Sequence, residues 1–99
     1  MKVKIHSIRF DADNDLLKFI KGKIDKLKLF NNQIINSEVF LRVNKSSKTD
    51  NKVAEIRINV PGKELFAKKQ GKSFEEATDA AVEALRRQLK KHKEKFKRE

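Results

Sequence analysis

The apolar residues of this chain follow two different periods, and their order along the sequence predicts the fold. Four segments alternate between apolar and polar residues, the period of two that is typical of strands with one buried face. These segments cover residues 1–5, 39–43, 54–60 and 65–67. A polar loop over residues 44–52 separates the second segment from the third, Pro61-Gly62 forms a tight turn before the fourth, and Gly71 closes it.

Two longer segments repeat their apolar residues every three or four positions, as amphipathic helices do. The first follows Asp13, a short carboxylate that suits a helix N-cap, and runs to about Phe30. The second begins at Ser73, whose spacing to Glu76 matches a capping box, and continues to Phe96. At 1.5 Å per residue this second helix spans about 35 Å, more than a typical strand. Its last turns are therefore expected to project past the core.

The order of elements is βαβββα, which predicts an α+β domain. A crossover helix makes the first two strands parallel, and short loops make the later strands antiparallel neighbours. The result is a four-stranded mixed sheet with two helices packed on one face, because only the helices can cover its apolar side. The residues expected on that side are Val3, Ile5, Val39, Leu41, Val43, Ile56, Ile58, Leu65 and Ala67.

Size and composition limit the possible functions. Ninety-nine residues with 37% apolar content support a single domain over residues 1–99, with a basic tail from about residue 90. The chain has no cysteine, which excludes disulfides and thiolate chemistry. Its apolar runs are far shorter than the ~20 residues of a membrane span. We therefore expect a soluble, cytoplasmic protein with no membrane partner and no small-molecule substrate.

Positive charge is concentrated rather than spread along the chain. The formal net charge is +11, from 25 Lys and Arg against 14 Asp and Glu. Residues 84–99 hold eight basic and two acidic residues, a net of +6, whereas residues 31–83 hold nine and eight, a net of +1. Solubility alone does not require such segregation. It indicates a surface that binds a polyanion, and nucleic acid is the first candidate.

A helical wheel places these cations on the outside of the second helix. With the apolar stripe against the sheet, Arg86 and Lys90 lie on one flank and Arg87 and Lys91 on the other. Further basic residues extend both flanks toward the C-terminus and line the first helix: Lys93, Lys97, Arg98, Lys18, Lys21, Lys23, Lys26 and Lys28. Helices side by side on one sheet would present rows of charge that could follow a phosphate backbone.

Catalytic and metal sites are poorly supported. Asp11, Asp13 and Asp15 resemble the start of an EF-hand loop, but Leu16 and Gly22 stand where glycine and glutamate belong, so helix capping is favoured. His6 and His92 are far apart and have no motif partner for general base catalysis or metal ligation. We therefore expect that the protein is not an enzyme and holds no metal and no cofactor.

An alternative nucleic-acid surface lies on the other side of the predicted sheet. Phe40 and Phe66 should point away from the helices, among the basic residues Lys4, Arg42, Arg57 and Lys68. Exposed aromatic rings on a sheet can stack RNA bases. This surface would suit a general double-stranded or single-stranded RNA-binding adaptor, although a cross-strand hydrophobic pair explains the two phenylalanines without a ligand.

The segment from Leu85 to Lys95, LRRQLKKHKEK, resembles the second-helix signature of the bacterial ribosome hibernation-promoting factor family, in its short single-domain form. The resemblance covers the whole chain and includes the βαβββα order, the helix-one stretch from Phe19 to Phe30 and the turn glycine Gly71. It implies a protein that binds the small (30S) ribosomal subunit at the decoding centre, where it competes with mRNA and tRNA and silences translation in starved or stationary-phase cells.

The resemblance also implies which side chains face 16S rRNA. The basic positions that match the family are Lys23, Lys26, Arg87, Lys91, Lys93 and Lys95, and the wheel adds Arg86 and Lys90. The short form is associated with pairing of inactive ribosomes. Because the chain ends at Glu99, without the additional domain of long-form relatives, it is expected to be a monomer off the ribosome.

Overall fold

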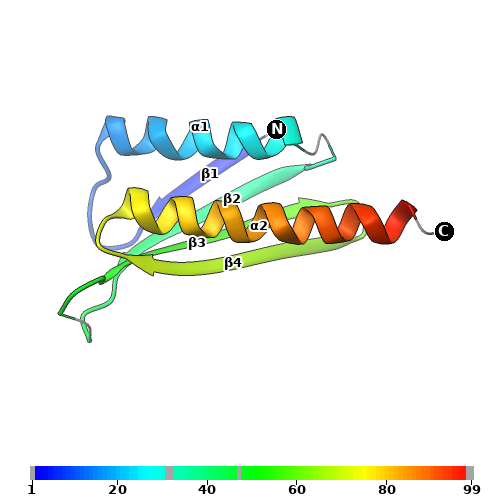
Figure 1. Ribbon diagram of the computed structural model, residues 1–99. Helices are drawn as coiled ribbons and strands as arrows, with labels where there is room; N and C mark the ends of the chain where they lie inside the picture. The colour runs from blue at the N-terminus through cyan, green and yellow to red at the C-terminus, as the bar shows by residue number, and fades with distance from the viewer. Residues whose placement is uncertain (1, 31–32, 47, 98–99) are drawn as a thin grey trace.

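The computed structural model describes residues 2–30, 33–46 and 48–97, with side chains described from residue 3 to residue 92 within those ranges. The elements follow the predicted βαβββα order (Figure 1). They are β1 (Lys2–Ser7), α1 (Asn14–Phe30), β2 (Asn36–Val43), β3 (Lys52–Val60), β4 (Lys63–Gly71) and α2 (Phe74–Lys97). The later strands begin a few residues earlier than their apolar patterns, so Lys52 belongs to β3 and not to the loop before it.

The four strands form one mixed sheet in the order β1-β2-β3-β4. β1 and β2 are parallel and place Ile5 beside Val39. β2 and β3 are antiparallel and place Val39 opposite Ile56, which in turn lies opposite Ala67 of the antiparallel β4. This register aligns apolar residues of all four strands on the same side, so the predicted topology is confirmed.

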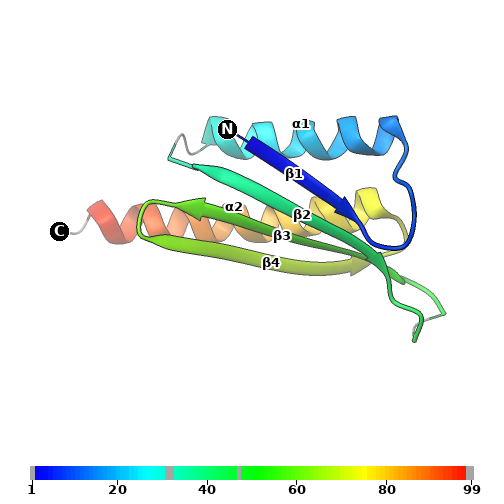
Figure 2. The same cartoon turned by 180° about the vertical axis from the view of Figure 1, so that it is seen from behind.

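Both helices cover one face of this sheet and leave the other face open. α1 lies over the β1 side and α2 over the β3 and β4 side, as opposite views of the molecule show (Figures 1 and 2). The core between the two layers is apolar. Its fully or nearly fully buried members include Ile20, Ile24, Leu27, Val39, Leu41, Ile56, Ile58, Leu65, Ala67, Ala77, Ala81, Leu85 and Leu89.

One residue predicted for the covered face of the sheet does not follow the prediction. Val43 is 39% exposed. It is the last residue of β2 and pairs with Lys52, the first residue of β3. This end of the β2–β3 hairpin lies beyond the N-terminal end of α2, so no helix covers it (Figure 1). The alternating pattern assigned Val43 to the correct side of the sheet. At this position, however, the layer of helices no longer covers the sheet.

Local sequence signals fix the ends of the elements. The Leu16 amide donates to Asp13 Oδ1 at 2.8 Å, and the Glu76 amide donates to Ser73 Oγ at 3.1 Å, so both predicted N-caps are in place. Gly62 has a φ of 78°, the left-handed conformation that the second central position of a Pro-Gly type II turn requires. At Gly71, a Cβ atom would lie 3.2 Å from the backbone nitrogen of Ala77, so glycine allows β4 to pass close to the start of α2.

Replacement of the α1 cap should destabilise the domain measurably. In Asp13→Ala the Leu16 amide loses its acceptor, and the first turn of α1 loses a favourable negative charge. We expect the free energy of unfolding to fall by about 1 kcal/mol in urea denaturation followed by circular dichroism. Asp11→Ala removes an exposed carboxylate nearby and is the matched control. An equal effect of the two substitutions would contradict the capping role of Asp13.

The C-terminal turns of α2 extend past the edge of the sheet, beyond the β3–β4 turn, as expected from the length of the helix (Figure 2). Phe96, Arg98 and the side chain of Lys97 belong to the predicted stripe and flanks but lie outside the residues whose side chains are described. Among the described residues, neither helix is apolar enough over a sufficient length to cross a membrane.

Candidate nucleic-acid interface

The packing of α1 determines which way its lysines point. Ile20, Ile24 and Leu27 are buried against the sheet and α2, at spacings of three and four residues. Residues of α1 that do not belong to this buried stripe therefore turn outward. Four of these are exposed lysines: Lys18, Lys21, Lys26 and Lys28. Lys23 is less exposed than these four, because it lies on the side of α1 that faces α2.

The packing of α2 has the same effect on its cations. Ala77, Ala81, Leu85 and Leu89 are completely buried and form the stripe that contacts β3 and β4. Four predicted site residues next to this stripe in the sequence are exposed: Arg86, Arg87, Lys90 and Lys91. Lys93 and Lys95 lie on the same helix, but their side chains are outside the described part of the chain. The two basic helices thus share one side of the molecule.

A groove of 320 Å³ runs between α1 and α2 and brings three of the predicted cations together. Its walls are formed by Lys23, Lys26, Leu27, Phe30, Asp79, Val82, Glu83 and Arg86. Lys23 Nζ lies 2.9 Å from Asp79 Oδ1 and so joins the two helices. Arg86 lies over the ring of Phe30, with its guanidinium carbon 5.5 Å from the ring centroid.

The groove also shows what the sequence analysis missed. Asp79 and Glu83 lie one turn apart on α2 and line the groove together with the basic residues. Glu83 Oε2 is 3.7 Å from Arg86, and Asp79 neutralises Lys23. Lys23 and Arg86 are therefore partly compensated cations, whereas the wheel treated all basic residues as equivalent. The i, i+4 spacing places Asp79 and Glu83 on the same flank of α2. The sequence of α2 alone does not show which flank faces α1.

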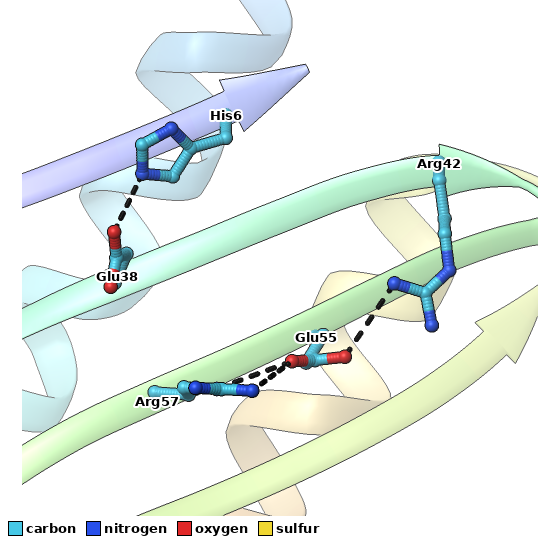
Figure 3. Close-up of polar contacts among 5 residues, drawn as sticks. All are labelled: His6, Glu38, Arg42, Glu55 and Arg57. Atoms are coloured by element: carbon cyan, nitrogen blue, oxygen red, sulfur yellow. Dashed lines mark hydrogen bonds and ion pairs between the residues drawn. The ribbon is translucent and has the colours of Figure 1, made fainter. Parts of the chain in front are cut away.

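The open face of the sheet carries a network of paired charges (Figure 3). Glu55 is 9% exposed and lies between two arginines. Its carboxylate is 3.1 Å from Arg57 Nη2 and 3.6 Å from Arg42 Nη1. On the neighbouring strands, His6 Nε2 is 2.7 Å from Glu38 Oε2. Arg42 and Arg57 of this face thus share one carboxylate.

Phe40 and Phe66 lie on this open face as predicted, but they do not form a cross-strand pair, and that interpretation was wrong. β3 separates β2 from β4, and Arg57 lies between the two rings, 5.6 Å from the centroid of Phe40 and 5.8 Å from that of Phe66. Phe40 also stacks on His6 with a centroid separation of 4.8 Å. The ring of Phe40 is therefore occupied by groups of the same chain, which leaves little surface for an RNA base.

The remaining candidates have structural partners. Asp13 caps α1, and His6 contacts Glu38 and Phe40. His92 is half-buried near the end of the described side chains. Within residues whose side chains are described, no three His, Asp or Glu side chains gather in a way that could hold a metal ion.

Comparison with known proteins identifies the family. Residues 3–97 match the model of the family described as sigma 54 modulation protein / S30EA ribosomal protein. The chain belongs to this family. It is 32% identical over 97 residues to the ribosome hibernation promoting factor of Klebsiella oxytoca and 30% identical over 97 residues to that of Escherichia coli K12. Each alignment covers 98% of both chains, so the resemblance in the second helix reflects membership of a family over its full length.

Two solved structures share the fold of this chain. A ribosomal subunit interface protein from Coxiella burnetii superposes with a TM-score of 0.84 at 19% identity, covering 94% of this chain and 98% of that chain. The N-terminal domain of Protein Y from Thermus thermophilus superposes with a TM-score of 0.79, also at 19% identity, covering 93% of this chain and 99% of that domain. This chain thus shares its overall fold with both structures.

Proposed function

We propose that this protein is a non-enzymatic ribosome hibernation factor that binds the 30S subunit in the cytoplasm. In this proposal the cations of α1 and α2 contact phosphates of 16S rRNA, and the folded domain occupies the channel that mRNA and tRNA need. Translation is silenced by exclusion, which suits a protein made during starvation or stationary phase. The names of its relatives, ribosome hibernation promoting factors, support this assignment.

The observation that carries the proposal is the position of both basic helices on one side of the sheet (Figure 1). Their apolar stripes are buried in a common core, so the exposed lysines and arginines are held at fixed spacings. A helix backbone that is already ordered suits binding to a folded RNA, because only side chains and not the main chain then have to be ordered. Within the proposed site, Lys26, Arg87, Lys90 and Lys91 contact phosphates directly, Lys93 and Lys95 extend the contact along α2, and Lys23 and Arg86 border the groove.

Binding by phosphate contacts predicts a strong dependence on salt. If about six phosphates are neutralised, affinity for the 30S subunit should fall about thousandfold between about 50 and 200 mM monovalent salt. Co-sedimentation of the purified protein with 30S subunits on sucrose gradients, repeated over this range, measures the effect. Affinity that does not change with salt would contradict an electrostatic interface.

Competition separates this function from that of a general RNA-binding adaptor. When mRNA and initiator tRNA are bound to the 30S subunit beforehand, they should prevent the protein from binding, since all three would use the same channel. An adaptor would bind a naked RNA duplex or oligonucleotide as tightly as it binds the subunit, and Phe40→Ala with Phe66→Ala would weaken it. The internal contacts of Phe40 favour the ribosomal function, for which the two aromatic substitutions should leave affinity unchanged.

A further inference from the structure

The groove between α1 and α2 has a composition that phosphate binding does not explain. Its volume of 320 Å³ is at the small end of the range for ligand pockets, about 300 to 1,000 Å³. Leu27, Val82 and Phe30 give it apolar walls, and Asp79 and Glu83 add two carboxylates. Carboxylates repel phosphates, and apolar walls offer them no hydrogen bonds. These features suit a flat, partly apolar group that donates hydrogen bonds.

Arg86 provides a surface on which such a group could stack. Its guanidinium carbon lies 5.5 Å from the centroid of the Phe30 ring, and the side chain remains 58% exposed. Arg86 thus contacts Phe30 while more than half of its side chain stays accessible to a ligand. RNA bases that are not paired commonly stack on aromatic rings and on guanidinium planes. A nucleobase therefore fits the groove better than any other part of an RNA.

The carboxylates decide which base the groove favours. Asp79 is held by Lys23 at 2.9 Å, whereas Glu83 lies 3.7 Å from Arg86, longer than a hydrogen bond, and can accept from a ligand. Guanine is the base whose Watson–Crick edge presents two adjacent N–H donors. Adenine and cytosine place an acceptor beside the amino group, and uracil flanks its one N–H with carbonyl groups. A carboxylate accepts hydrogen bonds from the two adjacent donors of guanine, and it is repelled by the acceptor atoms of the other three bases.

We propose that the α1–α2 groove binds an unstacked guanine nucleotide. The base stacks on Arg86, Glu83 accepts from its N1 and N2 groups, and Lys26, exposed on the wall of the groove, contacts its phosphate. The inference rests on the proposed function only for the source of the guanine, which would be a strand of ribosomal RNA. A free guanine nucleotide offers the same chemistry, and the test below separates the two sources.

The test compares guanine with adenine in an otherwise identical RNA. Two 5′-labelled uridine heptamers, with G or A at the central position, are titrated with the protein at low salt and followed by fluorescence anisotropy. We expect about tenfold tighter binding of the G heptamer, the discrimination of one good bidentate contact to a base. Unlabelled GMP and AMP are then added as competitors. Weak competition by GMP identifies the RNA strand as the ligand source, and competition as strong as that of the heptamer identifies the free nucleotide.

Matched variants test the assigned roles. Glu83→Ala should reduce the preference for guanine to within about twofold and leave binding of the A heptamer nearly unchanged. Glu75→Ala, an exposed glutamate in the first turn of α2, makes the same change of charge and should keep the preference. Arg86→Lys retains the charge but removes the stacking plane and should weaken both heptamers, whereas Arg9→Lys, at an exposed arginine in the turn after β1, should not.

Two results would overturn the inference. One is equal affinity of the native protein for the G and A heptamers, and the other is a guanine preference that survives Glu83→Ala. Either result leaves co-sedimentation with the 30S subunit unaffected, so the proposed function would stand. Conversely, a guanine preference in a protein that does not co-sediment with 30S subunits would disprove the ribosomal function and retain the groove as a nucleotide site.

Discussion

Simultaneous reversal of Arg87 and Lys91 to glutamate should weaken binding to the 30S subunit by about a hundredfold or more. Both residues are exposed on the outer side of α2, one turn apart. Two charge-assisted contacts to phosphate are lost, each of about 1.5 kcal/mol or more, and two repulsive carboxylates replace them. The melting temperature should change little, because both side chains are exposed and the double substitution touches no buried group. Co-sedimentation and thermal denaturation measure the two quantities.

The control for this variant is a reversal with the same change of net charge elsewhere. Lys45 and Lys48 are exposed in the loop between β2 and β3, away from both helices (Figure 1). Lys45→Glu with Lys48→Glu lowers the net charge by the same amount and should reduce affinity far less. If the two double variants lose affinity equally, net charge and not the helical surface governs binding, and the assigned site is incorrect.

Truncation of Leu85 should have the largest effect on stability. This side chain is completely buried and lies in the stripe of α2 that packs on β3 and β4, one residue before Arg86. Leu85→Ala removes apolar contacts and leaves a cavity, which costs about 3 kcal/mol in comparable cores. For a chain of this length the melting temperature should fall by roughly 15 °C. Urea denaturation and calorimetry provide the measurement.

Leu29→Ala is the matched control for this truncation. Leu29 is 88% exposed at the end of α1, so the same chemical change removes almost no buried surface. Its free energy of unfolding should stay within about 0.5 kcal/mol of that of the native chain. A loss in Leu85→Ala that is no larger than that in Leu29→Ala would mean that α2 is not anchored by its apolar stripe.

The fold was accessible from the sequence because its signals are local and consistent. Asp13 and Ser73 precede their helices with the correct spacing, and Pro61-Gly62 supplies the turn between β3 and β4. Periodicity then identified the inward side of each element, and the rule for crossover connections gave the parallel pair. Val43 was misjudged because the end of the second layer depends on where α2 begins, which is a tertiary property.

Contacts between elements could be predicted from the sequence far less well. Arg57 lies between Phe40 and Phe66 only because β3 separates β2 from β4, and Val53 is 2% exposed although it lies on the open face, between Arg42 and Gln70. Such neighbours depend on strand register, which a period of two does not determine. The groove likewise depends on how α2 is rotated about its axis relative to α1. The wheel therefore identified the basic residues of the candidate site but not the acidic and aromatic residues among them.

The pairing of Glu55 with two arginines has a consequence for the encounter with RNA. Glu55 offsets part of the positive charge of the two arginines on the sheet side, whereas α1 and the C-terminal half of α2 carry more basic than acidic residues. The excess positive charge is therefore concentrated on the helices. In the proposed binding, the field of the RNA would act on this uneven charge distribution and turn the helices toward the polyanion before contact, which would raise the fraction of productive collisions.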